Sequence, residues 1–217
     1  MGNLVLYLHG KGGSADESRH YVPLFPGWDV IGLDYRSDTP WEAGREIRGA
    51  VGRLKARYDR IDLVANSIGA FFAMHADIGA RISRAYLISP VADMERLILG
   101  MMLMENVTEE ALRARGTIRT GSGETLSWAY LCYVREHPVR WPVPTWILYG
   151  GGDRLTDRET MIRFAQVHGA KLTVMEEGEH WFHTEEQMAF LDRWLTESKG
   201  ESEKDMPPSA PQEVKGE

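Results

Sequence analysis

Short apolar runs alternate with amphipathic stretches along most of the chain. Six of these runs are rich in Val, Ile, Leu and Tyr and are bounded by Gly, Pro or Asp, which is typical of buried β-strands. Because they are almost continuously apolar, both faces of each strand should be covered, as in a parallel sheet with helices on each side. The predicted strands are 3–8, 29–33, 61–65, 85–89, 145–149 and 171–175.

Helix-start signals separate these runs. Thr39-Pro40-Trp41-Glu42 combines an N-cap, a proline at the first helical position and a capping-box Glu, and it predicts a helix over 40–58. The box recurs at 156–159 and 184–187, ahead of two further helices, and each box places a loop directly upstream. Pro23 and Pro26 instead exclude a long helix after the first strand. The pattern predicts one α/β domain over residues 1–198, with an open six-stranded parallel sheet.

Two regions fall outside the alternation. Residues 91–142 are rich in Met, Leu and aromatic residues, and helical patterns at 108–115 and 125–136 predict a helical cap inserted after the fourth strand. Residues 199–217 carry many charges, three prolines and little to bury, so we expect a disordered C-terminal tail. Within it, 208–211 fits a PxxP ligand motif, a kind of match that is usually accidental.

Composition narrows the class of protein. The chain of 217 residues has 25 Lys+Arg against 32 Asp+Glu, a net charge of −7, and no basic run, which argues against nucleic acid or an anionic membrane as a partner. The single cysteine, Cys132, excludes an internal disulfide. The N-terminus has no signal-peptide pattern, and the longest apolar stretch, 97–104, is far shorter than the roughly 20 residues that span a bilayer. We therefore expect a cytoplasmic protein.

The first candidate for chemistry is Ser67. The third predicted strand leads directly into Ala65-Asn66-Ser67-Ile68-Gly69, and a helix over 68–76 follows. Small residues two positions before and after a serine allow a tight strand-to-helix turn that exposes its hydroxyl, and the helix N-terminus offers N–H groups to a developing oxyanion. On this evidence alone, Ser67 could equally be the N-cap of that helix.

Two further side chains follow the fifth and sixth strands. Asp153 ends Tyr149-Gly150-Gly151-Gly152-Asp153, and His180 ends Glu176-Glu177-Gly178-Glu179-His180. The carboxyl ends of parallel strands share one crevice, so Ser67, Asp153 and His180 should meet there.

The chain order of these residues, nucleophile then acid then base, resembles that of the α/β-hydrolase fold family of serine hydrolases. Further segments carry the resemblance over residues 3–198: Leu8-His9-Gly10-Lys11 is similar to the family's oxyanion loop, 65–69 to its nucleophile elbow, 142–153 to its acid strand and turn, and 178–180 to its histidine loop. The sequence departs from the family in having Ala65 where glycine is commonest and in lacking the antiparallel strands that usually open the fold.

The resemblance implies roles for these residues. Ser67 would attack a carbonyl carbon, His180 would act as general base and Asp153 would orient the imidazole, while the backbone N–H groups of Lys11 and Ile68 would hold the oxyanion. No cofactor or metal is required. The implied activity is hydrolysis of small to medium carboxylic esters. Amide, thioester or lactone cleavage by the same triad remains open, as does a non-enzymatic receptor or scaffold. We take the Lys11 side chain to be a solvated charge.

The cap provides candidates for a substrate pocket. Its apolar side chains would form an acyl or alcohol pocket, or alternatively would pack on the core or form a homodimer contact. The pocket candidates are Met94, Leu97, Ile98, Met101 and Trp128.

Rival assignments remain open. His183 could replace His180 as the base, and Asp157 could replace Asp153 as the acid. A metal pair of His180 and His183 lacks an HExxH motif or a third ligand. Residues 10–15 fit G-x-G-x-x-A, and Asp34 stands about where a ribose-binding acid would, but Pro23 and Pro26 deny this motif its helix. The remaining histidines are taken as structural: His9, His75, His137 and His168.

Overall fold

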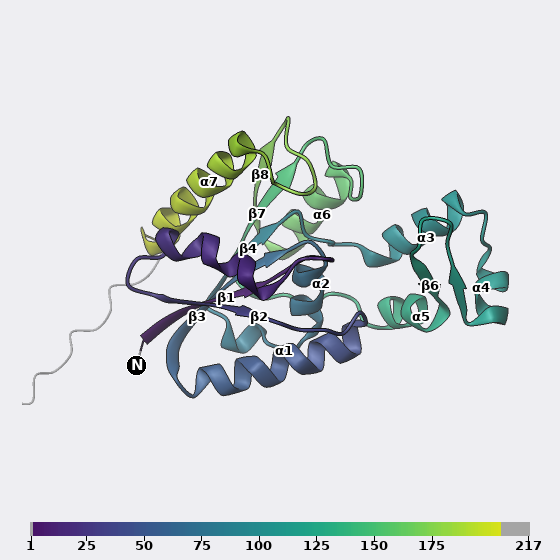
Figure 1. Ribbon diagram of the computed structural model, residues 1–217, viewed down its shortest axis with the longest axis horizontal. Coiled ribbons are helices and arrows are strands. Elements are labelled where there is room, and N and C mark those ends of the chain that lie inside the picture. Colours follow the sequence, from purple (N-terminus) through teal and green to yellow (C-terminus); the bar gives the residue numbers. More distant parts are fainter. Residues whose placement is uncertain (1, 205–217) are drawn as a thin grey trace, which may run out of the picture.

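A six-stranded parallel sheet forms the centre of the molecule, in the computed structural model that describes residues 2–204 (Figure 1). The strand order is β2-β1-β3-β4-β7-β8. The chain thus adds β2 on one side of β1 and all later strands of the sheet on the other side. This confirms the predicted fold class, and each predicted strand is present. The bounds are β1 (Gly2–Leu8), β2 (Asp29–Leu33), β3 (Tyr58–Asn66), β4 (Arg84–Ile88), β7 (Thr145–Gly150) and β8 (Lys171–Met175).

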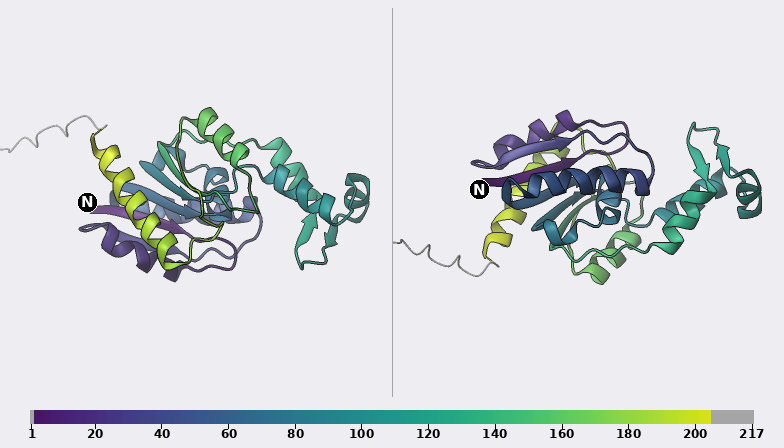
Figure 2. Two further views of the ribbon diagram at one scale, coloured as in Figure 1. Left: turned by 90° about the horizontal axis from the view of Figure 1, so that it is seen from above. Right: turned by 90° about the horizontal axis from the view of Figure 1, so that it is seen from below.

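Helical elements cover both faces of this sheet (Figure 2). In β1, Leu4, Leu6 and Leu8 belong to one hydrophobic core, and Val5 and Tyr7 belong to another on the opposite face. The first core is closed by α1 (Pro40–Lys55), α2 (Ile68–His75) and α6 (Arg158–His168), and the second by the 3₁₀ segment η1 (Ala15–Leu24) and α7 (Glu185–Lys204). A short 3₁₀ turn, η2 (Gly79–Arg81), precedes β4. Burial on both faces explains why the strands lack a polar alternation.

Three predicted boundaries need correction. Helix α1 ends at Lys55, not near 58, because Tyr58 already begins β3 and its hydroxyl donates to Asp29 Oδ2 at 2.6 Å. Helix α6 is capped by Asp157, whose side chain accepts from Thr160 N, and not by Thr156.

The third correction concerns the predicted tail, which does not begin at residue 199. Helix α7 continues to Lys204, because Ser198 is still buried against the sheet and Glu201 pairs with Lys171 of β8 at 3.1 Å. Residues 205–217, including the PxxP match at 208–211, lie outside the described residues. No helix within residues 2–204 has both the length and the apolar character needed to cross a bilayer.

The insertion after β4 projects beyond the carboxyl ends of the strands (Figures 1 and 2). It contains α3 (Met94–Met104), α4 (Glu109–Arg115), β5 (Thr117–Arg119), β6 (Thr125–Ser127) and α5 (Trp128–Glu136). The helix predicted over 125–136 is wrong in its first three residues: 125–127 pairs with 117–119 as an antiparallel hairpin, and the helix begins at Trp128, capped by the Ser127 side chain.

Candidate active site

Ser67 lies at the sharp turn between β3 and α2. Its φ and ψ are 51° and −119°, a region that a non-glycine residue occupies only when its surroundings enforce it. The backbone is held on both sides, since Ser67 N donates to Ile88 O at 2.9 Å and Ser67 O accepts from Val91 N at 3.2 Å. The turn also brings Gly69 against β1, where a Cβ would lie only 2.4 Å from His9 O. Only glycine fits at that position.

Ser67, His180 and Asp153 form a continuous hydrogen-bonded series. Ser67 Oγ lies 2.8 Å from His180 Nε2, and His180 Nδ1 lies 2.7 Å from Asp153 Oδ2. A carboxylate only accepts, so Nδ1 carries the proton and Nε2 is left to accept from the serine hydroxyl. The three loops that the sequence predicted to meet at one edge of the sheet therefore do meet.

The carboxylate of Asp153 is fully enclosed, with no exposed side-chain surface. Its Oδ1 accepts from the amides of Leu155 and Thr156 at 2.7 and 3.1 Å, and its Oδ2 accepts from the Thr156 hydroxyl at 2.8 Å. Burial by itself raises the pKa of this carboxyl, but the hydrogen bonds from His180, Thr156 and Leu155 outweigh burial and hold the pKa below its usual range. Asp153 is therefore a fixed anion.

Thr156 also belongs to the site, where it binds Asp153, and the sequence analysis did not predict this role. We predicted it as a helix cap, whereas its hydroxyl and amide both bind Asp153, and Asp157 takes the capping role. The spacing of an aspartate followed three residues later by threonine is the signal that could have revealed it, because such a pair closes a local side-chain-to-backbone turn.

The loop after β1 faces the same edge of the sheet. Gly10 to Gly13 form a turn closed by Gly13 N donating to Gly10 O at 3.2 Å, with Gly12 at φ 75°, and Lys11 follows Gly10 in it. Ile68 is the first residue of α2, where helical N–H groups have no partner within the helix. Within residues 2–204, neither the Lys11 nor the Ile68 amide donates a hydrogen bond.

His9 supports this loop from within. Its ring stacks on Tyr35 with centroids 4.3 Å apart, and its Nδ1 donates to Gly10 O at 2.8 Å. The Tyr35 hydroxyl in turn donates to His9 O at 2.6 Å. These contacts give His9 the structural place that the sequence suggested.

The rival residues lie away from the series. His183 stacks on Trp181 and its Nδ1 donates to Trp181 O at 2.7 Å, while Asp157 caps α6 and pairs with Arg96 at 2.8 Å. Asp34 pairs with Arg36 at the surface, and no α-helix follows the glycines of residues 10–13. Across the part of the chain that is described, no group of three or more His, Cys, Asp or Glu is arranged to hold a metal ion.

The predicted pocket residues divide into two groups. Met94 and Ile98 are buried in the hydrophobic core, with exposures of 6% and 4%, so their side chains are already packed. Leu97, Met101 and Trp128 are only partly buried against that core. Met94 and Ile98 therefore pack in the hydrophobic core, and a pocket role for the other three stays a prediction.

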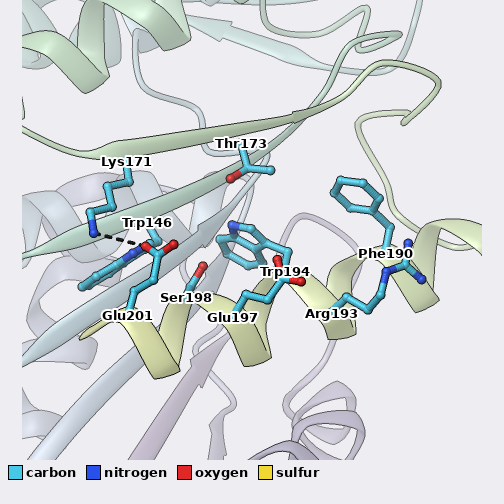
Figure 3. A pocket seen from close by; sticks show the side chains of 9 residues that line it. All are labelled: Trp146, Lys171, Thr173, Phe190, Arg193, Trp194, Glu197, Ser198 and Glu201. Carbon is cyan, nitrogen blue, oxygen red and sulfur yellow. Dashed lines mark hydrogen bonds and ion pairs between the residues drawn. The ribbon is translucent and has the colours of Figure 1, made fainter. Parts of the chain in front are cut away.

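A cavity of about 380 Å³ lies elsewhere, between β8 and α7 (Figure 3). Lys171 and Thr173 of β8 and Phe190 and Trp194 of α7 are among its lining residues, and no residue of the hydrogen-bonded series borders it. It is separate from the candidate site.

Comparison with other proteins gives the fold a name. No protein-family model matches the chain, and a search of curated proteins finds no match. Among solved structures, Est1E from Butyrivibrio proteoclasticus superposes with a TM-score of 0.77 at 19% identity, over 94% of this chain and 89% of that chain, and it has also been solved with ferulic acid bound. Mouse alpha/beta hydrolase domain-containing protein 10 gives 0.70 at 15% identity over 93% and 92%. The Pyrococcus furiosus esterase Pf2001 gives 0.61 at 17% identity over 94% and 82%. The chain therefore has the α/β-hydrolase fold, as its motifs predicted.

Proposed function

We propose that the protein is a serine hydrolase that cleaves small to medium carboxylic esters. One observation carries the proposal: Ser67 Oγ, His180 and Asp153 are in hydrogen-bonded series at 2.8 and 2.7 Å, at the carboxyl edge of a parallel sheet. Solved proteins with this fold include an esterase and a protein that binds ferulic acid, which supports acyl transfer and favours esters as substrates.

The proposed mechanism gives each residue of the site one step of acyl transfer. Ser67 Oγ attacks the ester carbonyl carbon as its proton passes to His180 Nε2, and the carbonyl oxygen becomes an oxyanion that accepts from the amides of Lys11 and Ile68. His180 then gives the proton to the departing alcohol, which leaves an acyl group on Ser67. Water attacks this acyl group by the same route, and the carboxylic acid departs. Asp153 stays ionised and stabilises the imidazolium.

Substrate selection is assigned to the insertion. Leu97, Met101 and Trp128 keep exposed apolar surface, and we propose that they contact the acyl or alcohol group. Thioester, amide and lactone cleavage would use the same series, so the substrate panel has to separate them from ester cleavage.

Turnover of a p-nitrophenyl ester series, ethyl ferulate, an acyl thioester and an anilide tests the proposal. The wild type should prefer esters, and Ser67→Ala should lower kcat by at least about 10³-fold with the fold intact. Ser37→Ala is the matched control, since this serine bonds Glu46 and lies outside the series. Absence of turnover of every substrate by folded protein, or a loss of only a few-fold in Ser67→Ala, would refute the assignment.

A further inference from the structure

We infer that Glu124, in the hairpin of the insertion, is a positioning residue for the oxyanion loop, acting through an ion pair with Lys11. The inference rests on the proposed function, because it assigns the Lys11 amide to the oxyanion hole. The insertion would then help to position the oxyanion donor, in addition to contacting the substrate.

The ion pair joins two distant parts of the chain. Lys11 Nζ and a carboxylate oxygen of Glu124 are in direct contact although the residues are 113 positions apart. The Lys11 side chain, which we expected to be solvated, is thus tied to the insertion. Both side chains keep solvent contact, with exposures of 64% and 43%.

The hairpin turn holds Glu124 in a defined position. Its carbonyl accepts from both the amide and the hydroxyl of Thr120, at 2.8 and 3.1 Å, and Gly123 N donates to Thr120 O at 3.1 Å. The Gly121 amide donates to Glu105 at 3.1 Å, which fixes the turn to the end of α3. A turn constrained in this way presents the Glu124 carboxylate to Lys11 without a large loss of backbone freedom on pairing.

Lys11 follows Gly10 in the Gly10–Gly13 turn, so a restraint on its side chain also restrains the peptide groups on either side. A second ion pair between the insertion and the sheet domain lies away from this turn. Arg96 of α3 binds Asp157 of α6, near the acid loop. Among the contacts of residues 2–204 described above, the Glu124 ion pair is the one that joins the insertion to the Gly10–Gly13 turn.

The size of the effect follows from the exposure of the pair. Exposed ion pairs contribute up to about 1 kcal/mol, which corresponds to about a two- to fivefold change in rate if the contribution is made in the transition state. Salt should weaken the pair, because the Debye length falls to about 3 Å at 1 M.

Steady-state kinetics of Glu124→Gln on p-nitrophenyl acetate test the inference. We expect kcat to fall about two- to fivefold with KM unchanged, and 1 M NaCl to lower the wild-type kcat to the level of the variant while leaving the variant unaffected. The matched control is Glu159→Gln, which removes a similarly exposed pair with Arg163 on α6 and should change neither constant.

An unchanged kcat or a change in KM alone in Glu124→Gln would overturn the inference while leaving the serine hydrolase assignment intact. Amide hydrogen exchange provides a readout that does not depend on activity. Lys11 and Gly12 should exchange faster in Glu124→Gln than in the wild type, and equal rates would overturn the positioning role. If the wild type hydrolyses no ester but exchange differs, the proposed function fails and the restraint on the loop stands.

Discussion

Replacing Asp153 by asparagine isolates the part that the carboxylate plays. In the wild type, Oδ1 accepts from the amides of Leu155 and Thr156, and Oδ2 accepts from His180 Nδ1 and the Thr156 hydroxyl. Asparagine has one acceptor oxygen, and the two amides will retain it. The NH₂ group then faces Nδ1, and because two N–H donors cannot share a hydrogen bond, the imidazole must take its other tautomer.

This change of tautomer prevents His180 from accepting the Ser67 proton. In that tautomer Nε2 carries the proton, so it cannot accept from Ser67 Oγ, although the distances are almost unchanged. The same substitution in a serine protease triad lowers kcat about 10⁴-fold, equivalent to about 5.4 kcal/mol of barrier. We expect a loss of about 10³- to 10⁴-fold here, because the enclosed carboxylate has no exposed surface through which water could replace it.

The assay is kcat for p-nitrophenyl acetate at pH 7.5, with the circular dichroism spectrum and the urea midpoint as checks of folding. Thr156→Val is the companion variant. It removes one donor to Oδ2 but keeps the carboxylate and the tautomer, so its loss of kcat should be far smaller than that of Asp153→Asn. A folded Asp153→Asn variant that retains more than a tenth of wild-type kcat would refute the tautomer argument.

Two further predictions concern stability. Gly69→Ala should destabilise the protein by about 1–3 kcal/mol in urea unfolding, because its Cβ would lie 2.4 Å from His9 O. Gly100→Ala, whose Cβ would point into open space, should stabilise it by about 0.4–1 kcal/mol. Equal effects would contradict the close approach at the elbow. Burial, followed by the charge of His137, lowers the pKa of His75 to about 4, so between pH 6.5 and 4 the unfolded chain binds a proton that the folded protein does not. As the pH is lowered from 6.5 to 4, the free energy of unfolding should therefore decrease by about 2 kcal/mol more in the wild type than in His75→Phe. An equal decrease in the two proteins, measured by urea unfolding at each pH, would disprove it.

The strands of the main sheet and the turn at Ser67 could be predicted from the sequence because both are encoded locally. Continuous apolar runs define each strand, and small residues around Ser67 define the turn that exposes it. Parallel strands then bring their carboxyl ends to one edge, so the meeting of Asp153 and His180 with Ser67 follows from topology and not from any contact visible in the sequence.

The features that the sequence did not reveal depend on contacts between distant or competing groups. Threonine is a common N-cap residue, but the Thr156 hydroxyl donates to Asp153 instead, and Asp157 caps α6. The β5–β6 hairpin has strands of three residues, which are too short for an alternation pattern to stand out. The Lys11–Glu124 pair spans 113 positions and carries no local signal.

The most direct test of the central claim, that Ser67 is an activated nucleophile, is covalent labelling by a fluorophosphonate followed by peptide mapping. We expect one adduct per molecule, located on Ser67, absent from Ser67→Ala and formed much more slowly in Asp153→Asn. Folded wild-type protein that takes up no label, or an adduct that persists in Ser67→Ala, would contradict it.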